Sequence, residues 1–208
     1  MNITVIGSGN MGSAFVKQLT QTGHDVFITS RNAAKAQELA ATYGATVVNA
    51  DVAAKADVLV LATSFDDAVP ALAALGDLSG KTVIDITNPL TADYMGLTIG
   101  HSTSAAEQIA AAYPGIKVVK AFNTLFAQVL GAGADFGNGQ TASVFVAADD
   151  VAAKQTVQTL ATGLGFNVVD AGPLKNARYL EPLAGLNIYF GYGAGLGTNI
   201  APTWLHKA

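Results

Sequence analysis

The feature that most constrains this chain is a glycine pattern close to its N-terminus. Gly7-Ser-Gly9-Asn-Met-Gly12 directly follows the apolar run at residues 3–6 and opens a stretch with helical periodicity. Between a strand and a helix this pattern is typical of a Rossmann fold. Its first glycine permits a tight turn, the second lets a pyrophosphate approach the backbone, and the third allows the helix to pack closely. We therefore predict a dinucleotide site, with the anion at the helix N-terminus.

The rest of the chain alternates short apolar runs with segments of helical period. We predict strands at residues 3–6, 25–29, 45–48, 58–62, 82–86, 117–122, 143–147 and 167–170, and helices at 11–22, 33–42, 67–74 and 151–162. Continuous apolar runs are typical of parallel strands that are buried on both faces. The expected fold class is α/β, a doubly wound, mostly parallel Rossmann sheet. We expect residues 1–170 to form the cofactor domain, and residues 171–208 a short helical extension packed on it as a substrate wall or dimer contact.

The end of the second predicted strand indicates which dinucleotide is bound. NAD-preferring sites usually have an acidic residue about 20 positions beyond the motif, whereas residues 29–32 contain no carboxylate. Ser30 and Arg31 can instead donate hydrogen bonds to a 2′-phosphate, and Lys35 adds a second cation if the turn is helical. The sequence therefore predicts NADP(H). In the alternative interpretation, Asn32 caps a helix and the two basic residues only face solvent.

Small polar residues follow three further predicted strands. Thr63 and Ser64 follow the fourth strand, and residues 87–88 and 123–124 follow the fifth and sixth. Open α/β sheets bind ligands at the carboxyl ends of their strands, where such side chains can contact ribose or nicotinamide. Each of these residues can equally be an ordinary turn or helix cap.

Composition excludes several other classes of protein. Half of the residues are apolar and 12% are charged, which suits a buried core and argues against disorder. A net charge of −4 argues against a nucleic-acid partner. The chain has no cysteine, and its three widely separated histidines, His24, His101 and His206, show no ligand spacing, so we expect no metal.

We expect a cytoplasmic protein without a membrane partner. The first residues are already strand-like, which leaves no room for a signal peptide. The most apolar stretch, residues 186–205, is interrupted by Pro202 and several glycines and is a poor membrane span. Because this apolar tail needs cover, we expect a homodimer.

Beyond the glycine motif and Ser30-Arg31, residues 170–178 (Asp-Ala-Gly-Pro-Leu-Lys-Asn-Ala-Arg) and Glu181 form a specific pattern. With these features the chain resembles the NADP oxidoreductase family that includes coenzyme F420-dependent NADP reductases. Residues 118–124 are also similar to the NADPH-binding domains of STEAP-type metalloreductases. The resemblance implies hydride transfer between nicotinamide C4 and a small-molecule acceptor, a deazaflavin such as coenzyme F420 or a flavin-like ring. Such transfer depends on proximity and orientation more than on a side-chain acid, so no catalytic residue is assigned.

The resemblance also implies a set of cofactor contacts. Pyrophosphate contacts fall on Gly7, Ser8, Gly9, Asn10, Met11 and Gly12; 2′-phosphate contacts on Ser30, Arg31 and Lys35; and ribose or nicotinamide contacts on Thr63, Ser64 and Asn123. The tail from Gly185 departs from the family pattern. Its glycines at 191–197 can form a close approach to a flat ring, a loop or a subunit contact, of which we favour the structural or interface role.

Two other functions are compatible with the sequence. A Rossmann domain can bind NADPH as a sensor without catalysing a reaction. A small imine or 2-hydroxyacid reductase would usually need a helical second domain or a proton donor in the cleft, for which Lys120 and Lys175 are available.

Overall fold

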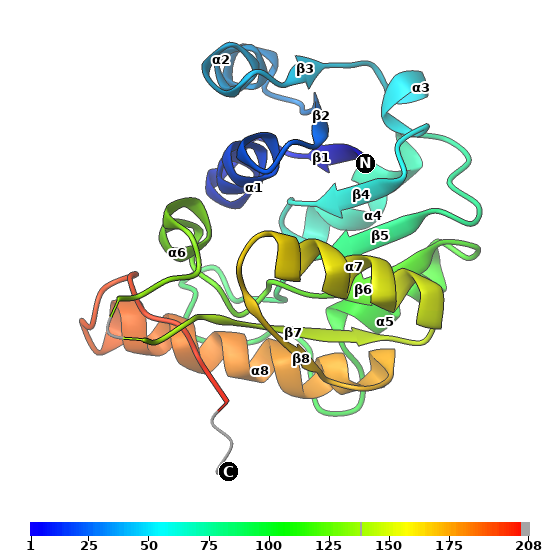
Figure 1. Ribbon diagram of the computed structural model, residues 1–208. Helices are drawn as coiled ribbons and strands as arrows, with labels where there is room; N and C mark the ends of the chain where they lie inside the picture. The colour runs from blue at the N-terminus through cyan, green and yellow to red at the C-terminus, as the bar shows by residue number, and fades with distance from the viewer. Residues whose placement is uncertain (138, 205–208) are drawn as a thin grey trace.

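In the computed structural model, which describes residues 1–137 and 139–204, the strands form a single eight-stranded sheet (Figure 1). The strands are β1 (Asn2–Ile6), β2 (Asp25–Thr29), β3 (Thr46–Val47), β4 (Val58–Leu61), β5 (Thr82–Asp85), β6 (Lys117–Lys120), β7 (Ser143–Ala148) and β8 (Asn167–Asp170). Neighbouring strands are parallel except β7, which runs antiparallel to β6. The predicted doubly wound, mostly parallel fold is confirmed.

The strand order is β3-β2-β1-β4-β5-β6-β7-β8, so the order reverses beside β1. Ile6, the last residue of β1, pairs with Thr29 of β2 and with Leu61 of β4. The loops that follow these three strands therefore begin side by side. Ligands of open α/β sheets bind at such a switch point, outside the carboxyl ends of the strands.

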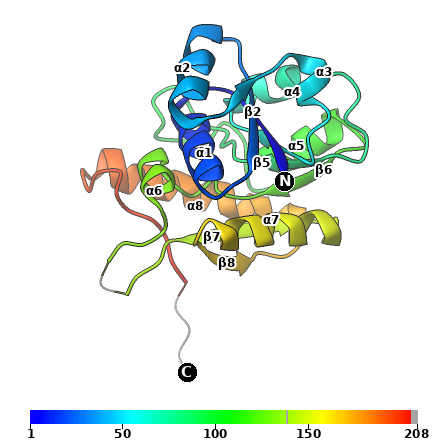
Figure 2. The ribbon, with the colours of Figure 1, turned by 45° about the horizontal axis from the view of Figure 1, so that its top comes forward.

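Helices cover both faces of the sheet (Figures 1 and 2). They are α1 (Asn10–Gln21), α2 (Ala33–Tyr43), α3 (Ala50–Ala53), α4 (Phe65–Ala73), α5 (Ala105–Ala112), α6 (Ala127–Ala132), α7 (Val151–Gly163) and α8 (Ala177–Ile188), with a 3₁₀ turn at Leu174–Asn176 and a π-helical turn at Tyr189–Gly193. Successive side chains of β1 point to opposite faces. Val5 belongs to the apolar core that includes residues of α1, α2, α6 and α7, and Ile6 to the core that includes residues of α3, α4 and α5.

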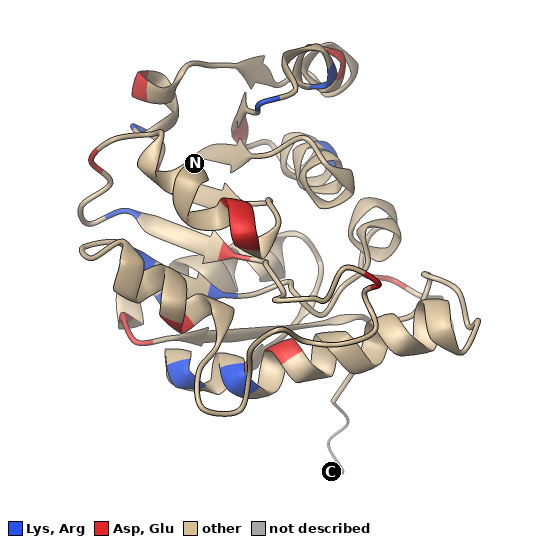
Figure 3. Cartoon of the chain, turned by 180° about the vertical axis from the view of Figure 1, so that it is seen from behind, with Lys and Arg blue, Asp and Glu red and all other residues tan. Residues whose placement is uncertain are grey.

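The predicted helical extension is present as α8. It packs against β7, where Leu180 contacts Phe145 and Ala147 in a small apolar cluster of its own. Figure 3 shows charged residues only in the first half of this helix, and residues 182–204 carry no Lys, Arg, Asp or Glu. The second half of α8 is therefore suited to line an apolar wall.

Some expected boundaries were wrong, for identifiable reasons. The strand expected to reach residue 122 ends at Lys120, because Phe122 has a left-handed backbone angle (φ 60°) that a strand cannot contain. Helix α4 begins two residues early, because Ser64 caps it by accepting a hydrogen bond from the Asp67 amide. Helices α3, α5 and α6 were not predicted, since four to eight residues are too few to show a clear period.

Candidate cofactor site

The three motif glycines have different structural reasons to be glycine. Gly7 has a φ of +113°, and a Cβ there would lie 2.4 Å from the Ala62 carbonyl oxygen. A Cβ on Gly12 would lie 2.2 Å from the Gly7 carbonyl oxygen. Both are required by packing within the protein, whereas Gly9 has ordinary extended angles and no atom within 4 Å of its Cβ position. The space beside Gly9 fits the close approach of a pyrophosphate.

A cavity of about 600 Å³ opens beside Gly9, between the loops that follow β1, β2 and β4. It brings together eight of the residues predicted to contact the cofactor: Gly7, Ser8, Gly9, Ser30, Arg31, Lys35, Thr63 and Ser64. The hydroxyls of Ser8 and Ser30 lie 2.8 Å apart, and this hydrogen bond joins the glycine turn to the loop after β2. The lining of this one cavity therefore includes both the glycine turn, which can hold a phosphate, and the basic residues Arg31 and Lys35.

The basic end of this first cavity is formed at the start of α2. Asn32 caps the helix by accepting a hydrogen bond from the Lys35 amide at 3.0 Å. The cap places Lys35 in the first helical turn, and Lys35 lines the cavity together with Arg31. The helix-cap interpretation of Asn32 and the cavity position of the two cations are therefore compatible.

Sequence reasoning missed a carboxylate at this end of the cavity. Asp67, on α4, accepts a hydrogen bond from Arg31 Nη2 at 2.6 Å and another from the Ser64 hydroxyl at 2.9 Å. The Ser64 hydrogen bond, followed by that from Arg31, holds the pKa of the Asp67 carboxyl below its usual range. An acidic residue three positions after a serine cap is a recognisable helix-start pattern, but its contact with Arg31 depends on the fold.

A second cavity of about 220 Å³ lies at the other side of the α1 N-terminus. Asn10, Met11 and Asn123 line it, so the structure separates these three predicted residues from the eight in the first cavity. Its walls include Asn88 and Thr124 at strand ends, the aromatic side chains Tyr94, Phe126 and Tyr192, and α8 residues Ala184, Asn187 and Ile188. Gly12 lines neither cavity and lies beneath the turn.

Asn123 is held firmly at the second cavity. Its Nδ2 donates hydrogen bonds to Asn88 Oδ1 and to the Leu180 carbonyl, both at 3.0 Å. Its Oδ1 is buried and has no hydrogen-bond partner among the described residues, and the same is true of the Thr124 hydroxyl. These two atoms therefore lack the partner that buried polar atoms normally have.

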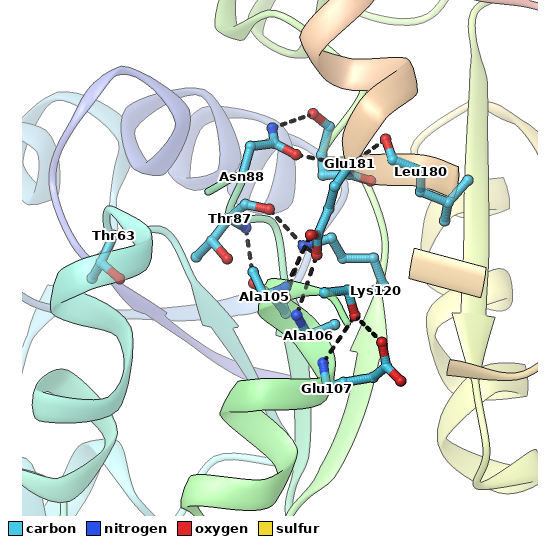
Figure 4. Close-up of polar contacts among 12 residues, drawn as sticks. Thr63, Thr87, Asn88, Ala105, Ala106, Glu107, Lys120, Leu180 and Glu181 are labelled. Carbon is cyan, nitrogen blue, oxygen red and sulfur yellow. Dashed lines mark hydrogen bonds and ion pairs between the residues drawn. The ribbon is translucent and has the colours of Figure 1, made fainter. Parts of the chain in front are cut away.

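Behind this cavity lies a buried charge cluster (Figure 4). Lys120 Nζ lies 2.9 Å from Asp85 Oδ2, 2.8 Å from Glu181 Oε1 and 2.5 Å from the Thr87 carbonyl oxygen. The Glu181 carboxylate also accepts hydrogen bonds from the first two amides of α5. Lys120 lines neither cavity, and Lys175 is exposed in the turn before α8, so neither lysine is placed as a proton donor to a substrate there.

The glycine-rich segment after α8 has a packing role at two of its positions. A Cβ on Gly191 would lie 2.6 Å from the Phe126 ring, and one on Gly193 would lie 2.7 Å from the Tyr189 ring. Tyr192 stacks edge-on against Phe126 with ring centroids 5.7 Å apart. The glycines thus let this turn fold tightly against the wall of the second cavity.

The described part of the chain contains neither a candidate membrane span nor a candidate metal-ligand cluster. None of its helices is both long and apolar enough to cross a membrane. No group of three potential metal ligands comes together within residues 1–137 and 139–204. His206, one of the three histidines, lies outside these residues.

The fold and the glycine turn define the class of protein, a Rossmann domain with a dinucleotide site. Residues 2–89 match the family model described as "NADP oxidoreductase coenzyme F420-dependent". A putative F420-dependent NADP reductase from Arthrobacter sp. FB24 is 32% identical, with a TM-score of 0.85 over 98% of this chain and 99% of that one. The chain belongs to this family of NADP-dependent oxidoreductases, as the sequence pattern predicted.

Two more distant similarities cover only part of the other protein. Rat (Rattus norvegicus) metalloreductase STEAP3 is 31% identical over 87% of this chain, which spans 36% of that protein's length. An imine reductase from Pseudomonas sp. is 21% identical, with a TM-score of 0.66 over 93% of this chain and 63% of that one. The second similarity shows a shared fold.

Proposed function

We propose that the protein is an NADPH-dependent oxidoreductase that transfers a hydride between NADP(H) and a deazaflavin (coenzyme F420) or flavin-like acceptor. The observation that carries the proposal is the pair of cavities on either side of the glycine turn. The first has cations at its far end, and the second has unpaired amide and hydroxyl groups. One dinucleotide that crosses the turn at Gly9 would use both.

In this proposal the first cavity binds the adenosine half of the cofactor. Gly9 and the α1 N-terminus receive the pyrophosphate, while Ser30, Arg31 and Lys35 receive the 2′-phosphate. Thr63 and Ser64 line the same cavity, so we assign them to the adenosine ribose rather than to the nicotinamide.

The second cavity would orient the nicotinamide, with Asn123 Oδ1 and the Thr124 hydroxyl as partners for its carboxamide. The bound cofactor supplies the hydride chemistry. The protein's part is to hold the two rings in contact and to exclude water, which the aromatic side chains of Tyr94, Phe126 and Tyr192 favour. No side-chain acid is required for this role.

The test is anaerobic NADPH oxidation against a panel of acceptors: a deazaflavin, FMN, a quinone and a ferric chelate. The ferric chelate is included because a STEAP metalloreductase is among the relatives. Turnover with the deazaflavin or FMN supports the proposal. Tight NADPH binding without turnover by any acceptor would indicate the sensor function instead.

Cofactor preference is tested separately with Arg31→Glu. This change removes charge-assisted hydrogen bonds to the 2′-phosphate, which are each worth about 1.5–3 kcal/mol, so NADPH binding should weaken at least about tenfold. NADH binding should change much less. Lys175→Glu makes the same charge reversal at an exposed position outside both cavities and should alter neither.

We further propose that the protein acts as a cytoplasmic homodimer. Tyr189, Phe190, Tyr192 and Leu196 expose apolar side chains after α8, in a stretch without charged residues. Contiguous apolar surface of this kind favours association. Light scattering on the purified protein, with Leu196→Lys as the variant, tests the dimer.

A further inference from the structure

The contact between Arg31 and Asp67 places a negative group where the 2′-phosphate of the cofactor would bind. The two side chains come from different loops, after β2 and at the start of α4, and both line the first cavity. Arg31 Nη2 lies 2.6 Å from Asp67 Oδ2. The Arg31 side chain is 85% exposed, and among the described residues it donates a hydrogen bond to Asp67 alone.

A carboxylate at this position treats the two dinucleotides differently. A 2′-phosphate and an ionised Asp67 both only accept hydrogen bonds, so they repel each other and compete for the guanidinium donors. The ribose 2′-hydroxyl of NAD(H) can instead donate a hydrogen bond to the carboxylate. An Asp carboxyl is already ionised near neutral pH at its ordinary pKa, and the hydrogen bonds from Ser64 and Arg31 lower the pKa of Asp67 further.

We propose that Asp67 is a specificity-determining residue, which competes with the 2′-phosphate for Arg31 and so reduces the preference for NADPH over NADH. This inference rests on the proposed NADP(H) site. The sequence predicts NADP(H) in part from the absence of a carboxylate in residues 29–32, after β2. The structure supplies the carboxylate from α4.

The chain offers a matched control for this residue. Asp66 precedes Asp67 in the first turn of α4, is exposed and does not line the cavity. Asp66→Asn and Asp67→Asn remove the same charge from the same end of the helix, so they alter the helix-dipole interaction alike. The Ser64 cap accepts its hydrogen bond from the backbone amide of residue 67, which Asp67→Asn retains.

The experiment is calorimetric titration of the wild-type chain and both variants with 2′,5′-ADP and with 5′-AMP at low ionic strength. These probes differ only by the 2′-phosphate and need no hydride acceptor. Asp67→Asn should bind 2′,5′-ADP about two- to fivefold more tightly, the range expected for loss of one exposed ion pair. Its affinity for 5′-AMP should be unchanged or lower, and Asp66→Asn should resemble the wild type.

The inference is wrong if Asp67→Asn leaves 2′,5′-ADP binding unchanged or weakens it, since Asp67 would then orient Arg31 rather than compete for it. An equal gain in Asp66→Asn would also overturn it, because the effect would be one of general charge. Titration of the wild type alone tests the proposed preference for NADP(H). If that protein binds 2′,5′-ADP no better than 5′-AMP, the proposed site and this inference both fall.

Discussion

Lys120 Nζ lies 2.8 Å from Glu181 Oε1, in an ion pair that is 0% and 1% exposed and joins β6 to α8. The same ammonium contacts Asp85 on the neighbouring strand and the carbonyl of Thr87, one residue before Asn88. Glu181 in turn accepts the first amide hydrogen bonds of α5. A single buried cation therefore ties the C-terminal helix to the strand ends that line the second cavity.

The first prediction is that Lys120→Met strongly destabilises the protein. The change leaves two carboxylates buried without their cation, and breaking a buried pair costs about 3–5 kcal/mol. Urea denaturation should show a free energy of unfolding that is lower by this amount, and a lower midpoint in consequence. Lys175→Met, at an exposed lysine, is the control and should be near neutral. A small effect of Lys120→Met would contradict the role of this cation in holding the two carboxylates and α8 together.

The second prediction separates folding from binding at the glycine turn. Gly9→Ala should leave thermal stability within about 1 kcal/mol of the wild type, because its Cβ enters open space. It should weaken NADPH binding markedly, because that space would receive the pyrophosphate.

Gly7→Ala is the matched comparison at the same turn. Its Cβ would meet the Ala62 carbonyl oxygen at a backbone angle that alanine disfavours, so this variant should unfold at a lower temperature. Melting curves and NADPH titrations of both variants provide the check. Unaltered NADPH affinity in Gly9→Ala would argue against a pyrophosphate at this turn.

The third prediction concerns the pH dependence of stability. Arg178 donates to both carboxylate oxygens of Glu107, at 2.7 and 2.9 Å. The hydrogen bonds from Arg178 are the main cause that lowers the pKa of Glu107 from 4.5 in the folded protein. The stabilisation is therefore present above the unfolded value and is lost as pH falls through the folded one.

Glu107→Gln should accordingly lower the free energy of unfolding at pH 7 by about 1 kcal/mol, the upper end for a partly exposed pair. The difference from the wild type should shrink as the pH falls below the unfolded pKa, about 4.3, and should vanish once Glu107 is protonated in the folded state as well. Urea denaturation across this pH range measures it. Glu38→Gln, at an exposed position on α2, should show no such convergence. A deficit that does not change with pH would show that shape rather than charge is lost.

The sequence predicted the sheet and the first cavity because their signals are local. The apolar patterns at residues 25–29 and 167–170 predicted both ends of β2 and β8 correctly. Contacts between segments far apart in the chain are only weakly indicated by the sequence. Asp85 and Lys120 each interrupt an apolar strand, which is a sign of a buried pair, but only the register of β5 and β6 brings them opposite each other. The contact of Asp67 with Arg31 likewise depends on how α4 is placed.

The last prediction tests which half of the cofactor reaches the second cavity. Asn123→Ala removes a buried acceptor there, and loss of one hydrogen bond, worth about 0.5–1.5 kcal/mol, should weaken NADPH binding about two- to tenfold. Binding of 2′,5′-ADP should be unchanged, because that molecule lacks the nicotinamide half. Arg31→Glu should by contrast weaken both ligands. If Asn123→Ala weakened both equally, Asn123 would act through its hydrogen bonds to Asn88 and Leu180, which shape the fold, rather than through the nicotinamide.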